Sequence, residues 1–479
     1  MEKIFQLRAH QTTVSKEMMC GLTTFLTMSY ILIVNPALVS ESGLPRDGIF
    51  VATALAAAIG CLLLALVARV PLAMAPGMGI NTFFTYTICG SLGFQWQEAL
   101  ALTFITGCLH ILIMGTRLRK ALVNGIPPHL KLAFGAGLGL FIAYIGLKNA
   151  GFLTFTIPPG QYELFPSGTV LANSSAVPAF VGAIAAPQLL ALIGLGLILS
   201  LLALERKTGD SYAALPVGII TATAVGIPLG VTQIGGVSFF DLSALGSLGE
   251  IFMSFWGRPG LLSLFDDPAR IPVALLIVMT MLLINLMDAI GTVMGIGQLQ
   301  NAEVFDPEDL EKFSRQNRAS KLDRTLIVNS CGGCLSACLG TTTSTVYMES
   351  ITGLVAGGRT GLTALTTGLM FLICLPLADF FRVIPAVAIA PALIVAGAFM
   401  IPLAGRINWN EFEESVPAFL TILCIPATYS FVYGIAAGVL SHVTIQLAVG
   451  KGRSVHPALY GVAVVFILVL VAETFGWAE

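Results

Sequence analysis

Two carboxyl side chains stand inside apolar stretches that are long enough to cross a membrane. Asp288 lies deep in residues 271–298, and Glu349 lies inside residues 340–357. A charged side chain near the centre of a bilayer costs about 2.5–3.5 kcal/mol on insertion scales, so such residues usually have a function. A carboxylate can accept N–H groups of a ligand, and burial favours its neutral form, so it can also carry a proton. A packing role is the alternative, which the equivalent placement of two such residues disfavours.

Two further segments combine polar residues with residues that interrupt helices. Segment 71–81 contains two prolines and two glycines, and segment 340–345 is a glycine followed by threonines and a serine. Proline removes a backbone donor and glycine weakens a helix, so breaks are predicted near Ala75–Asn81 and Gly340–Ser344. Broken backbone survives in hydrocarbon only where it lines a cavity or is buried in protein. Interrupted spans at corresponding places in two halves point to a transporter's binding site.

The elements that position these residues are predicted membrane spans. A crossing needs about 20 mostly apolar residues, and the chain is 56% hydrophobic and only 10% charged. The spans divide into seven and seven, and an odd number per repeat makes the repeats inverted, with spans three and ten equivalent. The predicted spans are 17–39, 48–69, 71–91, 98–116, 130–150, 187–205, 211–230, 271–298, 322–339, 340–357, 360–379, 383–402, 415–431 and 432–450.

One apolar segment and three connections lie outside the fourteen predicted spans. Segment 457–473 fits either a further span or a helix at the membrane surface. The connections 151–186 and 231–270 are expected to be surface loops, and 299–321 is expected to be a solvated, helical link between the halves.

The positions of the charges predict the orientation and exclude several functions. Most of the 24 Lys and Arg residues fall in loops on one side of the map, which places the N-terminus in the cytoplasm. The chain has no basic patch with interleaved aromatic residues and no Walker motif, so neither nucleic acid binding nor ATP-driven transport is expected. Cys331, Cys334 and Cys338 lie among small residues with no fourth ligand nearby, so a packing role is expected rather than a metal site.

Four motifs together resemble one family of membrane proteins. They are residues 27–36, residues 75–84, residues 288–292, and Glu349-Ser350 followed by residues 357–361. On these motifs the chain resembles the AzgA-like adenine/guanine/hypoxanthine permeases, a branch of the nucleobase–ascorbate transporter superfamily, and the likeness covers almost the whole chain.

The resemblance implies an architecture and a function. The architecture is an all-α polytopic membrane protein of about fourteen spans, built as a seven-plus-seven inverted repeat with short extended breaks in spans three and ten. Spans 1–4 (residues 1–120) and 8–11 (271–380) would form a core domain, and spans 5–7 (121–270) and 12–14 (381–479) a gate domain. The implied function is proton-coupled import of purine nucleobases such as adenine, guanine, hypoxanthine or xanthine.

The resemblance also gives the site residues their roles. Glu349 is expected to accept N–H groups from the purine edge. Asn81 and the backbone amides of Gly79, Ile80 and Gly340 are expected to contact the remaining edge. Asp288 is expected to carry the coupling proton, with Glu349 as the second candidate.

The chain departs from the family at one position of span eight. The family usually shows two aspartates three residues apart, whereas this chain has Asn285 before Asp288. Asparagine keeps the shape and hydrogen bonding but cannot titrate. The substrate preference or the proton coupling is therefore expected to differ from that of the typical member.

The expected partners are a purine nucleobase, a proton and membrane lipid, in a bacterial cytoplasmic (inner) membrane. No cofactor, metal or enzyme activity is expected. A transporter of the same architecture for uracil, urate or an anion is one alternative, and a channel is another. The oligomeric state stays open, with a homodimer as one candidate.

Overall fold

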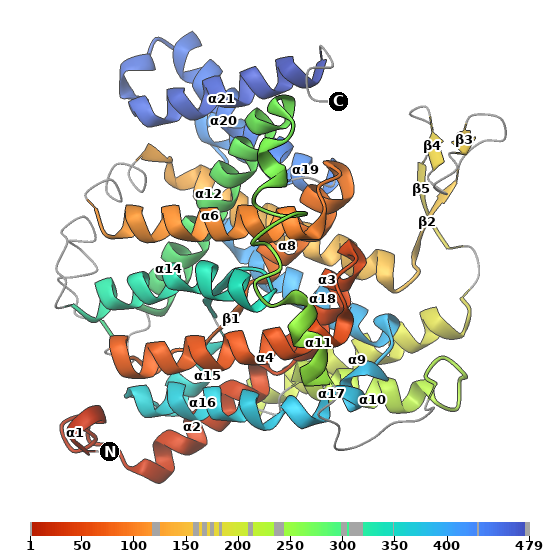
Figure 1. Cartoon of the computed structure of the whole chain (residues 1–479), viewed down its shortest axis with the longest axis vertical. Coiled ribbons are helices and arrows are strands. Elements are labelled where there is room, and N and C mark those ends of the chain that lie inside the picture. The colour runs from red at the N-terminus through yellow and green to blue at the C-terminus, as the bar shows by residue number, and fades with distance from the viewer. Residues whose placement is uncertain are drawn as a thin grey trace.

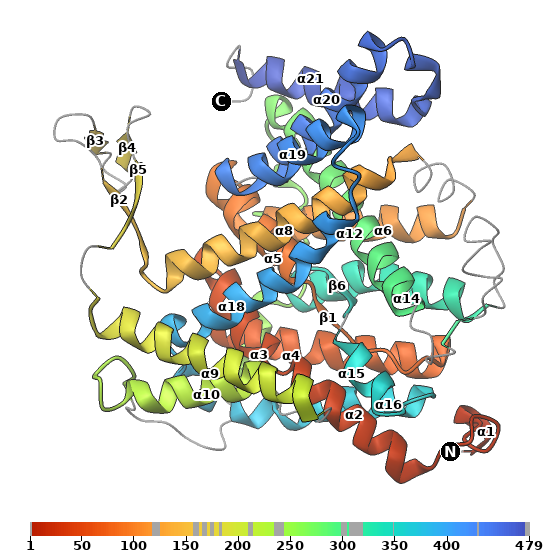
Figure 2. The ribbon, with the colours of Figure 1, turned by 180° about the vertical axis from the view of Figure 1, so that it is seen from behind.

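The computed structural model shows a helical body in which most long helices run in similar directions across the view (Figure 1). A β-hairpin projects from one side of this body, as the view from behind also shows (Figure 2). The structure describes residues 2–116, 125–156, 162–164, 170–172, 177–181, 184–208, 214–233, 244–297, 304–305, 320–347, 349–428 and 431–474.

Each of the seven predicted spans of the first half is occupied by a helix or by a strand followed by a helix. A short helix α1 (Glu2–Phe5) precedes them. The spans are formed by α2 (Val14–Met28) with α3 (Ile31–Val39), α4 (Arg46–Leu63) with a wider helical turn Leu64–Ala68, β1 (Met74–Pro76) with α5 (Met78–Thr82) and wider turns Phe83–Ser91, α6 (Trp96–Met114), α8 (Pro128–Asn149), α9 (Ala186–Thr208) and α10 (Ala214–Gly226).

The second half repeats this order, which confirms the predicted fold of two sets of seven segments with breaks in spans three and ten. Helix α11 (Ala244–Ile251) lies in the connection between the halves, and α21 (Pro457–Thr474) follows the last predicted span. The spans are formed by α12 (Ile271–Gly297), α14 (Lys321–Leu339), β6 (Ser344–Val346) with α15 (Ser350–Val355), α16 (Gly361–Ile373) with α17 (Ala378–Arg382), α18 (Ala386–Met400), α19 (Phe412–Ala427) and α20 (Phe431–Ala448).

The two broken spans meet as a pair of antiparallel strands. Met74 pairs with Val346 and Pro76 pairs with Ser344. Two backbone hydrogen bonds extend the pairing: the Gly77 amide donates to the Thr343 carbonyl at 2.9 Å, and the Tyr347 amide donates to the Ala73 carbonyl at 3.0 Å. Extended backbone therefore finds its hydrogen-bond partners inside the protein, as a lipid environment requires.

The breaks are shorter than the sequence predicted. Extended backbone ends at Gly77, and α5 begins at Met78, so Asn81 lies in a helix. On the other side, Gly340 ends α14 with a left-handed conformation of φ 86°, a common use of glycine at a helix C-terminus. The strand itself begins four residues later, at Ser344. The polar run of residues between Gly340 and Ser344 therefore connects the helix cap to the strand.

The helices pack mainly within two groups. Helices α2, α4 and α6 of the first half pack on α14 and α16 of the second, and α8 and α9 pack on α18 and α19. Contacts between the groups include those of α5 with α8 and of α3 with α18. The division into a core domain and a gate domain stays a prediction, and it is taken up under Proposed function.

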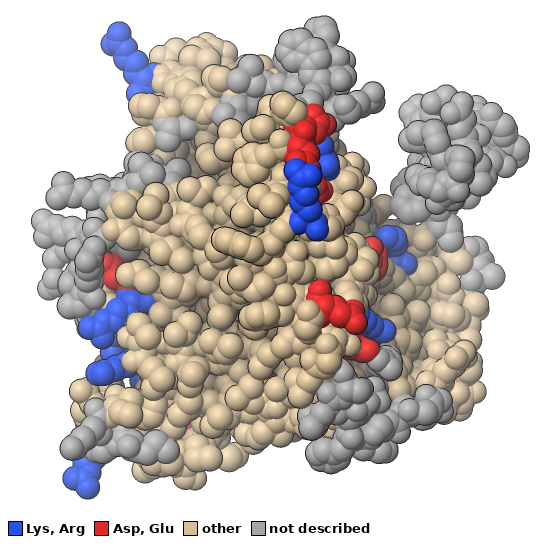
Figure 3. Space-filling model, viewed as in Figure 1, with Lys and Arg blue, Asp and Glu red and all other residues tan. Residues whose placement is uncertain are grey.

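The outside of the body is suited to lipid. A broad band without charged side chains lies between the Lys and Arg residues on the left of Figure 3 and the charged residues to the right of its centre. Many large apolar side chains are exposed, among them Leu112, Leu199 and Phe419. Six helices in the described part of the chain have the length and hydropathy for a full crossing, and others are shorter apolar helices. These features indicate an integral membrane protein.

Two predicted surface loops contain regular structure. In 151–186, strand β2 (Leu153–Thr156) pairs with β5 (Val177–Phe180), and β3 (Tyr162–Leu164) pairs with β4 (Val170–Ala172). These strands form the projecting hairpin of Figures 1 and 2. In 231–270, α11 packs on α4, and Ile251 is fully buried. Sequence reasoning missed both because the segments are too short for a span and were assigned by length alone. Most of the predicted link 299–321 lies outside the described residues.

Candidate functional site

Glu349 lies at the turn that precedes α15, directly after the strand break of span ten. Its Oε1 accepts a hydrogen bond of 2.7 Å from the hydroxyl of Tyr30 in span one. Its backbone carbonyl accepts a bond of 2.7 Å from the Thr352 hydroxyl, which in turn lies 3.0 Å from the hydroxyl of Thr27. Span one therefore contacts the side chain of Glu349 directly and its backbone only through Thr352.

Asp288 reaches the same place from span eight. Its carboxyl is hydrogen-bonded to the side chain of Thr345 in β6, and it lies close enough to Glu349 and Tyr347 to interact with them electrostatically. Both carboxyl residues are only partly buried although they lie deep in the bundle. The structure therefore brings together the two carboxyls that the sequence singled out.

Asn81 adds an amide from span three. The residue is fully buried, and its Oδ1 accepts a hydrogen bond from the Thr342 hydroxyl of the polar run. Its Nδ2 has no partner among the described residues. The amide oxygen of Asn81 thus has a partner in the protein, and its Nδ2 group is available to donate to a ligand or to water.

Asn285 is also fully buried, three residues before Asp288 on α12. Neither its Nδ2 nor its Oδ1 has a hydrogen-bond partner in the part of the chain that the structure describes. Leaving a buried polar group unpaired costs about 1–3 kcal/mol. An unpaired amide one turn from a carboxyl is therefore suited to meeting a ligand or water.

The other predicted site residues have backbone and packing roles in the structure. Gly79 lies against α8, where an added methyl carbon would come within 2.5 Å of Leu138 Cδ2. The Ile80 amide donates to Gly77 at 3.1 Å, and the Gly340 amide donates to Ala337 at 3.1 Å, so both are used inside their own turns. Contacts of these residues with a substrate stay predictions.

Sequence reasoning missed three residues that are hydrogen-bonded to predicted site residues, and a fourth that is bonded to the broken span three: Tyr30, Thr342, Thr345 and, bonded to Pro76, Tyr347. Each stood in a segment already singled out, either the motif 27–36 or the polar run and the residues just after it. Only carboxyl side chains, amide side chains and backbone amides of these segments were chosen, because a hydroxyl is a common group in helices and its direction depends on the fold.

Buried polar side chains accept hydrogen bonds from the backbone of the paired segments. The Val346 amide donates to Asn329 Oδ1 at 2.8 Å, and the Ser344 amide donates to Ser336 Oγ at 3.1 Å, both on α14. On the other strand, the Ala73 amide donates to Ser350 Oγ at 2.9 Å. The edges of the strands are therefore satisfied by side chains, which fixes the position of the residues that follow them.

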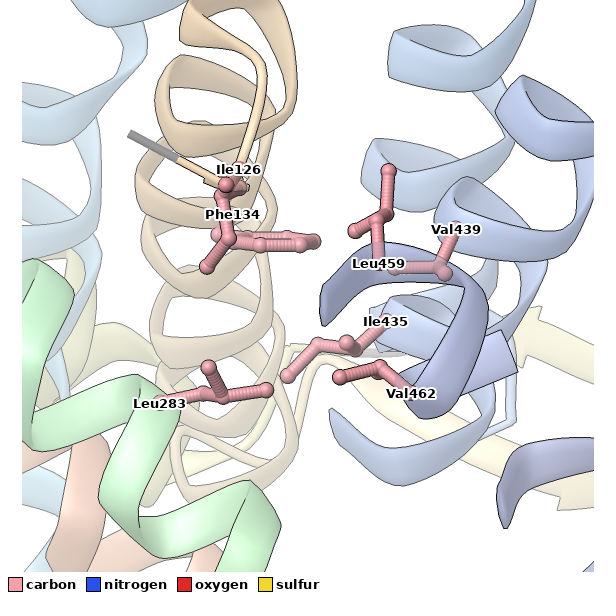
Figure 4. Close-up of a pocket in the computed structure, with 8 residues that line it drawn as sticks. Ile126, Phe134, Leu283, Ile435, Val439, Leu459 and Val462 are labelled. Carbon is pink, nitrogen blue, oxygen red and sulfur yellow. The ribbon is translucent and has the colours of Figure 1, made fainter. Parts of the chain in front are cut away.

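A pocket elsewhere in the structure has a different character. It has a volume of about 20 Å³ and is lined by apolar residues of α8 and the segment just before it, and of α12, α20 and α21, including Phe134, Leu283 and Ile435 (Figure 4). A flat polar ligand needs a few well-placed donors and acceptors, and this lining offers none. The candidate site is therefore the one at the paired strands.

The fold and the site together define a class of protein. Two sets of seven segments, broken spans paired in the middle, and buried carboxyl and amide groups beside the break are typical of a secondary membrane transporter. Residues 15–437 match the model of the Permease family (Xan_ur_permease), and the chain belongs to this family. Its relatives are transporters and not enzymes.

The chain is similar to several characterised permeases over nearly its whole length. It is 34% identical to the guanine/hypoxanthine permease PbuG of Bacillus subtilis (strain 168), over 98% of this chain and 99% of the relative. It is 32% identical to the adenine permease AdeP of Escherichia coli (strain K12), over 98% of this chain and 96% of the relative.

Solved structures share the fold at much lower identity. The transmembrane domain of the cyanobacterial bicarbonate transporter BicA matches with a TM-score of 0.56 at 17% identity, over 89% of this chain and 97% of that chain. SLC26A9 matches with a TM-score of 0.57 at 13% identity, over 94% of this chain and 68% of that chain. This likeness supports the fold alone.

Proposed function

We propose that this chain is a proton-coupled symporter that imports purine nucleobases. The proposal is carried by one observation: Asp288 and Glu349 lie at the paired strands within electrostatic reach of each other, with unpaired amide atoms of Asn81 and Asn285 on neighbouring elements. The printed names of the relatives, guanine/hypoxanthine permease and adenine permease, support the same class of substrate.

The chemistry of these groups suits a purine. The ring is flat and carries N–H donors and nitrogen or oxygen acceptors around its edge. Glu349 can accept N–H groups, the Asn81 Nδ2 can donate to a ring acceptor, and the Asn285 amide can do either. Discrimination follows from this arrangement because a base that leaves one of these buried groups unpaired binds less well.

Transport against a gradient needs a coupled ion. Asp288 is our candidate for carrying the proton, because it is the carboxyl of span eight that contacts the strand break through Thr345. Glu349 is the second candidate. Each proton that moves inward supplies about 2.3 kcal/mol per 100 mV of membrane potential, in addition to the pH difference.

We propose that transport moves one of the two groups of helices against the other. Spans 1–4 and 8–11 would carry the site as a core domain, and spans 5–7 and 12–14 would form the gate that it moves against. The membrane would be a bacterial cytoplasmic membrane with the N-terminus inside, as the positions of Lys and Arg suggest. A homodimer stays one candidate for the assembly.

A transporter of the same fold for another solute is the alternative. The names of two solved neighbours, a bicarbonate transporter and a member of the SLC26 anion transporters, make an anion one such solute. Two carboxyls at the site oppose an anion by charge repulsion, so we favour a neutral base. Uracil and urate are distinguished from adenine, guanine and hypoxanthine by experiment.

Uptake of tritiated adenine, guanine and hypoxanthine in cells that lack their own nucleobase permeases tests the proposal. We expect saturable uptake that falls when a protonophore is added, and competition by unlabelled purines but not by uracil. Uptake that is unchanged by the protonophore would exclude proton coupling. Competition by uracil, urate or bicarbonate alone would favour the alternative.

A further inference from the structure

Three side chains of span one contact span ten. At the end of α2, the Thr27 hydroxyl lies 3.0 Å from that of Thr352. In the middle of span one, Tyr30 reaches Glu349. Farther along, the buried Asn35 Nδ2 donates to the hydroxyl of Thr341 at 3.1 Å, and also to Thr53 at 2.6 Å. Span one therefore runs along the whole break of span ten, before and after the strand.

The contact between Tyr30 and Glu349 matters most for the chemistry of the site, because it involves one of the two carboxyls. Tyr30 is 1% exposed, and its hydroxyl donates to a carboxyl oxygen that lies 319 residues away in the sequence. A glutamate side chain rotates about three bonds, so a carboxyl at a turn is not held in one direction by its own backbone. A buried tyrosine rotates about two bonds and its ring is held by packing, so it can hold the carboxyl that it touches.

The backbone of the same residue is held independently. The Thr352 hydroxyl donates to the Glu349 carbonyl, and Thr27 lies against that hydroxyl. Loss of the Tyr30 hydroxyl would therefore leave the turn in place and release only the side chain. This separation makes the role of Tyr30 testable by a single substitution.

We propose that Tyr30 is a positioning residue for Glu349: it holds Oε1 and so directs Oε2 toward the ligand. This proposal rests on the proposed function of Glu349 as the acceptor for the N–H groups of a purine. Tyr30 thus contributes to affinity through the orientation of another side chain and has no need to touch the base.

Tyr30→Phe tests the proposal because it removes one oxygen and keeps the ring. A hydrogen bond to a charged group is worth about tenfold to a hundredfold in an equilibrium. We expect KM for adenine or hypoxanthine uptake to rise by about tenfold or more, with the maximal rate within about twofold of wild type. A matched control is Tyr460→Phe, which removes a hydroxyl that donates to the Gly452 carbonyl far from the site. The control should change neither constant.

A second measurement does not depend on the substrate. In purified protein, the infrared band of the Glu349 carboxyl is the one that disappears in Glu349→Gln. We expect this band to shift in Tyr30→Phe and to stay in place in Tyr460→Phe and in Thr27→Val. An unshifted band, or an unchanged KM, would overturn the proposal.

The two measurements separate the two claims. A shifted band in a protein that transports no purine would leave Tyr30 as the residue that holds Glu349 and would reject the proposed substrate. An unshifted band in a protein that transports purines would reject the role of Tyr30 and keep the proposed function.

Discussion

The hydroxyl of Tyr347 donates a hydrogen bond of 2.5 Å to the carbonyl of Pro76 and so joins two broken spans that are 271 residues apart. Pro76 and Tyr347 lie at the opposite ends of the two paired strands, so the tyrosine ring crosses from one strand to the other. The contact joins the two strands close to the carboxyls of Asp288 and Glu349.

Tyr347→Phe should therefore affect both stability and affinity. A lost hydrogen bond costs about 1 kcal/mol, which for a chain of this size lowers the Tm by at most about 2 °C. Because the bond lies at the site, we also expect weaker binding of purines. Fluorescence-detected thermal unfolding in detergent and a binding titration check the two effects. Tyr460→Phe, the peripheral control, should change stability only.

Glu349→Gln should abolish purine binding and leave the protein folded. The change preserves size, and the amide oxygen can still accept from the Tyr30 hydroxyl. It replaces the other oxygen by an NH₂ group, which faces the purine N–H with a donor in place of an acceptor. Calorimetric titration of purified protein measures binding, and gel filtration checks folding. Wild-type affinity in a folded variant would refute the role of Glu349.

The sequence predicted the elements well because a membrane leaves few choices. Backbone in hydrocarbon must be helical or internally paired, so length, hydropathy and a few prolines and glycines located the spans and both breaks. The limits of the strands were missed, because Gly340 serves as a helix cap and Met78 already begins a helix. Whether a glycine caps, bends or extends a segment depends on the partner strand, which lies in the other half of the chain.

The candidate site was only partly accessible to sequence reasoning. Asp288 and Glu349 stood out because charges are rare in apolar segments. The hydroxyls of Tyr30 and Thr345 did not stand out, because threonine and tyrosine are ordinary residues in membrane helices and only the fold shows which acceptor they reach. A hydrogen bond between different spans, such as that of Tyr30 with Glu349 across 319 residues, carries no local pattern in the sequence.

Gly79 provides a test of the contact between the two groups of helices. It lies in span three, and its lack of a side chain makes room for Leu138 of α8. Gly79→Val should therefore push the two helices apart and reduce uptake by about tenfold or more, whereas the double variant Gly79→Val with Leu138→Ala should recover much of it. A double-mutant cycle on the uptake rate measures the coupling. Additive losses would show that the two residues act separately.

Cys108 and Cys334 provide a test of rigidity inside the predicted core domain. Their sulfur atoms lie 3.6 Å apart, where α6 crosses α14 closely at Gly107. Oxidation of the purified protein by diamide, which takes up the two thiol hydrogens, should join these cysteines, as peptide mapping without reductant can check. We expect uptake to survive, because we propose that both helices belong to the core domain and move together. The matched contrast is a cysteine pair at Gly79 and Leu138, which should block uptake when joined.

Asp288 and Asn285 provide the test of coupling and selectivity. Asp288 can bind and release a proton, whereas Asn285, three residues earlier on the same helix, cannot. Asp288→Asn should remove accumulation driven by a pH gradient and can leave base-for-base exchange intact, since exchange needs no net proton movement. Asn285→Asp restores the usual family residue, and we expect it to shift the order of substrate preference or the pH optimum without destroying transport.

Both variants can be compared in proteoliposomes with an imposed pH gradient and a potential clamped by valinomycin and potassium. The informative quantity is the ratio of internal to external base at steady state. If Asp288→Asn still concentrates the base as the wild type does, the coupling proton is carried elsewhere, and Glu349 becomes the candidate. If Asn285→Asp leaves both the substrate order and the pH profile unchanged, then the unpaired amide of Asn285 does not face the substrate, and the purine contacts must come from Asn81 and Glu349 alone.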